Sequence, residues 1–113
     1  MAFGTRAAFD PIREIAFGSI SGTYAAIGSG LTQHARIVKI TNGTNAPMYI
    51  STDGVNDEDK IPANGFVLYD FSTNRIRDDG LFIPIGTIFY VKQDTAPTSG
   101  SVWVTVIYGE GGV

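Results

Sequence analysis

The chain lacks cysteine altogether and contains few charged residues. Without cysteine among its 113 residues, it has no disulfide framework, no thiolate zinc site and no thiol nucleophile. Charged residues make up 17% of the chain, and the formal net charge is -3. Binding to DNA or RNA needs clustered lysine and arginine, so we expect no nucleic-acid partner. Stability must come from packing or from protein partners.

Long apolar runs are also missing. No segment approaches the roughly twenty apolar residues that span a bilayer, and residues 1–14 lack the apolar stretch of a secretory signal peptide. We therefore expect no membrane partner and no signal-directed export. A chain of this length buries a single core, which predicts one domain over residues 1–113.

The sequence is rich in short runs of apolar and β-branched residues that are separated by turn-forming residues. Segments such as Gly28-Ser29-Gly30 and Ser99-Gly100 separate the runs. This pattern predicts an all-β fold, either a sandwich or a barrel. Residues 1–11 are expected to form an N-terminal arm, and residues 109–113 a glycine-rich C-terminal tail. The predicted strands cover residues 12–17, 23–27, 35–41, 47–52, 66–71, 88–92 and 102–108.

Asn42-Gly43 is the sharpest local turn signal. A type I′ turn needs positive φ at both central residues, and this pair of residue types tolerates it. Residues 40–54 are therefore predicted to form a hairpin of two strands folded about Asn42-Gly43. The loop can also be longer, because Thr44-Asn45 is turn-like and Pro47 cannot donate a hydrogen bond within a central strand.

Several predicted strands are apolar on both faces. In residues 102–108, valines alternate with Trp103, Thr105 and Ile107, and residues 66–71 have a similar character. A domain this small cannot cover both faces of every strand by itself. Two interpretations stay open: these side chains lie under long loops, or some of them form a subunit contact.

The sequence contains no catalytic motif. His34 is the only histidine, and no carboxylate lies near it at a telling spacing. Residues 18–22 have isoleucine where the nucleophile of a G-x-S-x-G motif would stand. Residues 28–33 begin like a dinucleotide-binding loop but lack its third glycine and a following helix. We therefore expect that the protein is not an enzyme and has no cofactor.

The acidic segment 53–59 is the best candidate for a metal site. Asp53, Asp57 and Asp59 supply hard oxygen ligands of the kind that calcium prefers. The segment does not follow the EF-hand order of ligands and glycine, and acidic loops commonly serve to keep an exposed tip in solvent. We expect a solvated loop without a metal ion.

Six segments in the last two thirds of the chain combine strand and turn residues in a recurring texture. They are residues 38–42 (VKITN), 50–55 (ISTDGV), 61–74 (IPANGFVLYDFSTN), 83–87 (IPIGT), 89–92 (FYVK) and 99–104 (SGSVWV). Over residues 36–108 this texture resembles small virion structural proteins of tailed bacteriophages. The shared features are packing and turn motifs, so the resemblance carries over no functional residue.

The resemblance implies a single-domain antiparallel β-sandwich of jelly-roll type with a non-enzymatic, structural role in a virion assembled in the host cytoplasm. Within that class we expect a capsid decoration or cement protein that stabilises the head. Its partners would be phage capsid proteins and further copies of itself in a homo-oligomer. Repeated weak contacts over a lattice would let so small a domain stabilise a shell. The alternative within the class is a neck or tail component, in contact with neck or tail proteins.

The predicted interaction surface joins the hairpin, the acidic loop and one aromatic side chain. Its candidate residues are Asn42, Gly43, Asp53, Asp57, Asp59 and Trp103. A second alternative function is a carbohydrate- or receptor-binding module that uses exposed aromatic rings as stacking platforms. Its candidate rings are Tyr24, Tyr49, Tyr69, Tyr90 and Trp103. A small hydrolase is a third alternative, opposed by the missing nucleophile motif and the single histidine.

Overall fold

The computed structural model describes residues 6–71 and 83–110. These residues form eight β-strands and one turn of 3-10 helix, and no helix among them is long and apolar enough to cross a membrane. The elements are β1 (Arg6–Ala16), η1 (Phe17–Ser19), β2 (Ala25–Ala26), β3 (Ala35–Asn42), β4 (Met48–Ser51), β5 (Asp59–Ile61), β6 (Phe66–Asp70), β7 (Tyr90–Gln93) and β8 (Ser101–Glu110).

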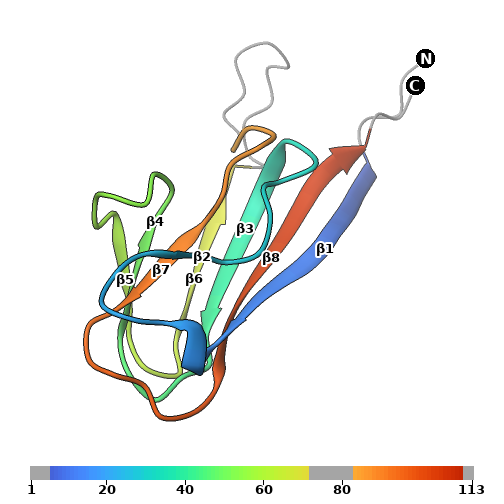
Figure 1. Cartoon of the computed structure of the whole chain (residues 1–113). Coiled ribbons are helices and arrows are strands. Elements are labelled where there is room, and N and C mark those ends of the chain that lie inside the picture. The colour runs from blue at the N-terminus through green and yellow to red at the C-terminus, as the bar shows by residue number, and fades with distance from the viewer. Residues whose placement is uncertain (1–5, 72–82, 111–113) are drawn as a thin grey trace, which may run out of the picture.

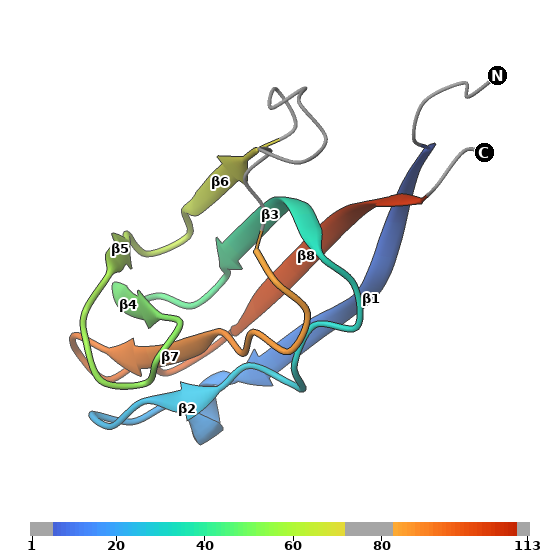
Figure 2. The ribbon, with the colours of Figure 1, turned by 90° about the horizontal axis from the view of Figure 1, so that it is seen from above.

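The strands form two four-stranded antiparallel sheets (Figures 1 and 2). Sheet 1 has the strand order β1-β8-β3-β6, and sheet 2 has the order β2-β7-β4-β5. The first strand therefore pairs with the last, the second with the seventh, the third with the sixth and the fourth with the fifth. This nested pairing is the jelly-roll topology of a two-sheet sandwich. The predicted fold class is confirmed.

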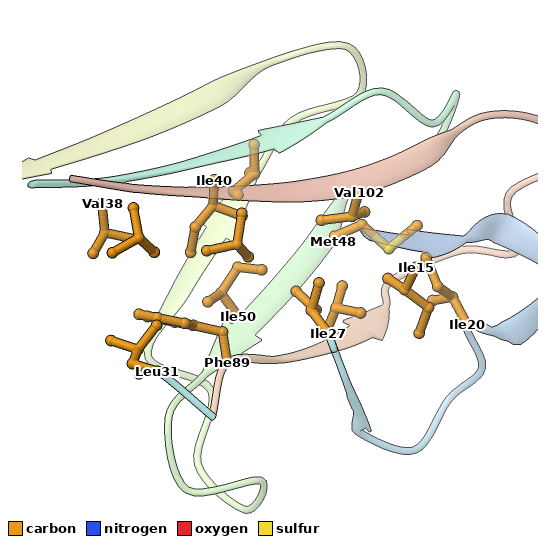
Figure 3. Close-up of a cluster of buried hydrophobic side chains, with 14 of the residues drawn as sticks. Ile15, Ile20, Ile27, Leu31, Val38, Ile40, Met48, Ile50, Phe89 and Val102 are labelled. Atoms are coloured by element: carbon orange, nitrogen blue, oxygen red, sulfur yellow. The ribbon is translucent and has the colours of Figure 1, made fainter. Parts of the chain in front are cut away.

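The core lies between the two sheets (Figure 3). In β3 and β8 fully buried positions alternate with half-buried or exposed ones, so each strand gives one face to the core. Fully burying one large aliphatic side chain stabilises the fold by about 1.5–3 kcal/mol. Segments outside the strands complete the core, because Ile20, Ile27, Leu31 and Phe89 are buried there.

The predicted hairpin over residues 40–54 is not formed. β3 and β4 belong to different sheets, so the segment between them crosses from one layer of the sandwich to the other. Neither Asn42 nor Gly43 has a positive φ, which a type I′ turn would require. The prediction is wrong because the Asn42 side chain forms buried hydrogen bonds and Gly43 permits a close approach of the backbone to β8.

The first and last described strands extend beyond the predicted ones. Residues 6–11, which we assigned to an N-terminal arm, form the first half of β1, and residues 6–10 pair with β8. Gly109 and Glu110, which we assigned to the C-terminal tail, are the last residues of β8. The remaining residues of both predicted segments, 1–5 and 111–113, lie outside the described part of the chain.

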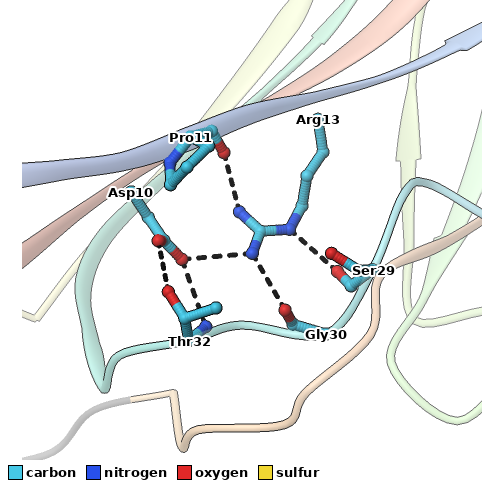
Figure 4. A network of polar contacts seen from close by, with 6 residues as sticks. All are labelled: Asp10, Pro11, Arg13, Ser29, Gly30 and Thr32. Carbon is cyan, nitrogen blue, oxygen red and sulfur yellow. Dashed lines mark hydrogen bonds and ion pairs between the residues drawn. The ribbon is translucent and has the colours of Figure 1, made fainter.

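An irregularity in β1 lies between Asp10 and Arg13, where the register against β8 shifts. Both side chains are buried and face the segment that follows β2 (Figure 4). The Arg13 guanidinium donates to the carbonyl oxygens of Pro11, Ser29 and Gly30 at 2.8, 2.8 and 2.9 Å. Its Nη2 also forms an ion pair with Oδ2 of Asp10 at 3.1 Å. Arg13 thus fixes the glycine-rich segment after β2 to β1.

The Asp10 carboxylate has a second partner in Thr32. It accepts hydrogen bonds from the Thr32 backbone N–H at 3.2 Å and from the Thr32 hydroxyl at 2.5 Å. Burial raises the pKa of the Asp10 carboxyl, but the hydrogen bonds from Thr32 and Arg13 outweigh burial and hold the pKa below its ordinary value. Asp10 is therefore ionised at neutral pH, and the buried pair is an ion pair.

Candidate assembly surface

Asn42 ends β3 and is fully buried. Its side-chain amide donates to the carbonyl oxygens of Ala46, Ile61 and Pro62 at 2.9, 3.3 and 3.1 Å. Its Oδ1 accepts hydrogen bonds from the backbone N–H and the hydroxyl of Thr44, at 3.0 and 2.6 Å. The placement of Asn42 on an exposed surface is therefore wrong, because these bonds bury the amide and shape the crossover between the sheets.

Gly43 lies against the half-buried indole ring of Trp103. A Cβ atom on Gly43 would lie 2.4 Å from Cζ3 of Trp103 and 3.0 Å from the carbonyl oxygen of Ser101. The Gly43 N–H donates to that same oxygen at 2.8 Å. Glycine is required here by the close approach of the backbone to β8.

The carboxylate of Asp53 organises the loop between β4 and β5. It accepts hydrogen bonds from the Ser51 hydroxyl at 2.6 Å and from the backbone N–H groups of Val55 and Asn56 at 2.8 and 2.9 Å. The Asn56 side-chain amide donates a fourth bond at 2.7 Å. These bonds, with that from Ser51 the strongest, hold the pKa of Asp53 well below its ordinary value. Asp53 therefore acts as the internal acceptor of an exposed loop.

The carboxylates of Asp57 and Asp59 form ion pairs or hydrogen bonds with side chains from distant parts of the sequence. Asp57 forms an ion pair with Lys92 at 2.8 Å and accepts a hydrogen bond from the Tyr24 hydroxyl, and Lys92 is the main cause that lowers the pKa of Asp57. Asp59 accepts a hydrogen bond from the Tyr69 hydroxyl. Among the residues that the structure describes, no three histidine, aspartate or glutamate side chains are grouped as metal ligands.

The six residues of the predicted surface are not brought together. The β3–β4 crossover and the start of β8 lie at one end of the sandwich, and the β4–β5 loop lies at the other (Figure 1). Asn42, Gly43 and Trp103 therefore form one cluster, while Asp53 and Asp57 in the β4–β5 loop and Asp59 at the start of β5 form a separate region. His34 is part of neither group, and its Nδ1 accepts a hydrogen bond from the Ile85 N–H at 3.1 Å.

The outer face of sheet 2 carries a row of alternating aromatic and cationic side chains. Tyr49 lies between Lys60 on β5 and Lys92 on β7, with the two Nζ atoms 5.1 and 5.2 Å from the centroid of its ring. Lys92 also lies 4.9 Å from the centroid of the Tyr24 ring. Lys60 forms an ion pair with Asp94 at 3.0 Å. This face is polar, and both lysines already have anionic and aromatic partners.

The outer face of sheet 1, in contrast to that of sheet 2, is largely apolar. The strand pairing aligns its outward-facing residues in three rows that run across β1, β8, β3 and β6. The first row is Phe9, Ile107, Ile37 and Asp70; the second is Thr105, Lys39 and Leu68; the third is Glu14, Trp103, Thr41 and Phe66. Ile12 has no register partner on β8, but it is exposed in the irregular part of β1 between Phe9 and Glu14, at the β1 end of the second row. We call these twelve residues the apolar face, because seven of them are aliphatic or aromatic.

The largest apolar side chains at the two edges of the apolar face are open to solvent. Phe9 and Ile12 on β1 are 68% and 63% exposed, and Phe66 and Leu68 on β6 are 58% and 55% exposed. In the middle, Lys39 places its Nζ 4.8 Å from the centroid of the Phe66 ring. Extended exposed apolar patches of this kind mark binding surfaces on soluble proteins.

Sequence reasoning identified only part of this surface. The apolar character of both faces of residues 66–71 and 102–108 left a subunit contact open as one of two interpretations, and Trp103 was among the candidate residues. Phe9 and Ile12 were missed, because the first lies in the predicted N-terminal arm and the second could not be assigned to a face without the irregularity in β1. The available signal was the presence of two large apolar residues, Phe9 and Ile12, in the segment that forms β1.

Comparison with known proteins gives fold similarity alone. No protein-family model matches the sequence, and no curated protein matches it. A chain of the capsid asymmetric unit of the cyanophage Pam1 superposes with a TM-score of 0.51 and 15% identity, over 97% of this chain and 89% of that chain.

Two further solved structures are more distant. The virus-like particle of the extra small virus of the giant freshwater prawn Macrobrachium rosenbergii gives a TM-score of 0.47 and 8% identity, over 95% of this chain and 79% of that chain. The Dit protein of phage SPP1, which belongs to the hub adsorption apparatus of phages that infect Gram-positive bacteria, gives 0.42 and 13%, over 90% of this chain and 49% of that chain.

Proposed function

We propose that this protein is a non-enzymatic structural component of a bacteriophage virion, and within that class a decoration or cement protein of the head. The observation that carries the proposal is the apolar face on the outside of sheet 1. Its side chains contribute little to the stability of the isolated chain while they remain in water. Burial against protein stabilises by about 25 cal/mol per Å² of apolar surface, so the face is suited to assembly.

The fold supports a place in a viral shell. The chain from the Pam1 capsid asymmetric unit has a similar fold and, since both chains are covered nearly end to end, a similar length. Jelly-roll sandwiches of this size are building blocks of capsids. A neck or tail component is the alternative position for the same fold.

The carbohydrate-binding alternative receives no support from the aromatic residues of sheet 2. Lys92 lies against the rings of both Tyr24 and Tyr49, and Lys60 lies against Tyr49 as well. A sugar would need to stack on a free ring face, which these ammonium groups restrict. A glycan array that yields a reproducible ligand, lost in Tyr49→Ala, would favour the alternative instead.

The copy number of the protein in purified virus particles tests the proposal. Quantitative mass spectrometry relative to the major capsid protein should find this chain in numbers comparable with the capsid lattice. A count of about a dozen or fewer would place it in a closed ring at the neck or tail. Absence from the particles would overturn the virion role altogether.

A further inference from the structure

We infer that the apolar face is a self-association interface, which packs against the same face of a second copy of this chain about a two-fold axis. The inference rests on the proposed structural role and names the first partner in assembly. The three rows allow a second copy to be tested as the partner. In a two-fold contact the same surface of both copies meets, so each residue of the apolar face must lie against another residue of that face.

The axis that fits runs parallel to the strands between β8 and β3. Rotation by a half turn about this axis places β1 of one copy over β6 of the other and β8 over β3. Each row then faces the same row of the second copy. In the second row, Lys39 faces Thr105 of the second copy, so the two Lys39 side chains do not face each other. Ile12, exposed at the β1 end of this row, lies against the exposed Leu68 of the second copy.

Two of the three charged residues of the apolar face, Glu14 and Lys39, are complementary under the same operation, whereas Asp70 faces Phe9 at the edge of the contact. In the third row, Glu14 faces Phe66 of the second copy, and Phe66 is the ring over which Lys39 lies at 4.8 Å. The exposed Glu14 carboxylate of one copy therefore reaches the Lys39 ammonium of the other. Symmetry repeats this ion pair, so two pairs form at opposite edges of one contact. A partner with an uncharged apolar surface would leave both groups without a counter-charge.

The size of the face sets the expected affinity. Four strands about 4.8 Å apart and three rows about 6.8 Å apart make a face of roughly 20 Å by 20 Å. Two such faces of roughly 400 Å² each bury about 800 Å², which is below the range of about 1,200–2,000 Å² for stable interfaces, so the contact is a weak one and the dimer should dissociate on dilution. Two sheets that pack in this way keep their strands within about 30° of each other, which preserves the facing of the rows.

Sedimentation velocity of the purified full-length chain, from low micromolar to near-millimolar concentration, tests the inference. The wild-type protein should convert from monomer to dimer as its concentration rises. Leu68→Lys should raise the dissociation constant by about tenfold or more, because it buries a charge opposite Ile12. Val55→Lys is the matched control, since Val55 is 76% exposed in the β4–β5 loop, outside the apolar face. It should dimerise like the wild type.

A charge swap tests the proposed two-fold arrangement. Glu14→Lys and Lys39→Glu should each weaken the dimer, and the double variant should restore it, because the pair re-forms with its charges exchanged. Cooperative thermal unfolding of each variant establishes that it is folded, and Ile12→Lys provides a second probe of the same contact if Leu68→Lys is not. A wild-type protein that stays monomeric, a dimer unaffected by Leu68→Lys and Ile12→Lys, or a double variant as weak as the singles would overturn the inference.

These outcomes are separable from those of the proposed function. A monomeric protein that is nevertheless abundant in virus particles would remove the second copy as partner and leave the virion role intact. A dimer that the charge variants weaken, but that is absent from particles, would support the second copy as partner and remove the virion role.

Discussion

Gly43 and Trp103 are in such close contact that the position of a Cβ atom on Gly43 falls 2.4 Å from the indole ring. Two segments far apart in sequence thereby approach each other at the end of sheet 1. The same glycine also hydrogen-bonds the backbone of β8 through its N–H, at 2.8 Å from the carbonyl oxygen of Ser101. The contact joins the crossover between the sheets to the start of β8.

Gly43→Ala should therefore destabilise the fold. The added methyl group overlaps both the ring and the Ser101 carbonyl oxygen, so we expect a loss of about 1–3 kcal/mol in the free energy of unfolding, measured by urea denaturation. Gly22→Ala is the control, because nothing lies within 4 Å of its Cβ position. Equal effects of the two substitutions would contradict the close packing of Gly43.

Arg13→Met should be among the most destabilising single substitutions in the chain. It removes the cation and leaves the buried Asp10 carboxylate without its charge partner, which typically costs about 3–5 kcal/mol. Lys60→Met breaks the exposed ion pair with Asp94 and should have little effect. Urea denaturation of the two variants compares a buried with an exposed ion pair, and a small loss for Arg13→Met would contradict the network in Figure 4.

The Asp10 carboxyl should make stability sensitive to acid. Its folded-state pKa lies below the value of about 3.9 expected for the unfolded chain, so its stabilising contribution is complete above that value and is lost as the pH falls through the folded pKa. The difference in unfolding free energy between wild type and Asp10→Asn should be constant from neutral pH to about pH 5 and should shrink below about pH 4. A difference that stays constant in acid would exclude this role.

Tyr24 should ionise only at unusually high pH. Burial and then the hydrogen bond to the Asp57 carboxylate raise the pKa of its hydroxyl well above the ordinary value of about 10. In absorbance titrations at 295 nm, the increment that Tyr24→Phe removes should therefore lie above that range. In urea the same increment should return to about pH 10, and an ordinary titration in the folded protein would contradict the contact.

Calcium should not stabilise the β4–β5 loop. Asp53 already accepts four hydrogen bonds from its own loop, and Asp57 is paired with Lys92. Thermal unfolding in millimolar calcium should match that in a chelator. A melting temperature that rises with calcium concentration, and does so no longer in Asp53→Ala, would establish a site that the present geometry does not favour.

The fold class was predictable because it depends on local signals. Strand-sized apolar runs and the turn residues between them indicate a β-sandwich whatever the pairing. The pairing itself was not predictable, since β1 joins β8 from the far end of the chain. Asn42-Gly43 shows the limit of local reasoning, because the residue types that favour a tight turn are also those that form a buried amide hub and permit a close backbone approach.

The candidate surface was predictable only as a property of single strands. Alternation in residues 66–71 separates Phe66 and Leu68 from Val67 and Tyr69, but it does not say which pair faces the core. That choice is made by the second sheet, which packs on Val67 and Tyr69 and leaves Phe66 and Leu68 outside. The acidic loop drew attention because of its charge, yet its charges are mostly used within the chain.

The pairing of β1 with β8 also determines when sheet 1 can form during synthesis. Even the two paired residues that are closest in sequence, Ala16 and Ser101, are separated by most of the chain. At typical translation rates the ribosome needs on the order of ten seconds to produce that stretch. Throughout this interval β1 has no partner strand, so sheet 1 cannot be completed until β8 has been made. Pairing between segments so far apart in sequence is therefore expected to make folding slow for a domain of this size.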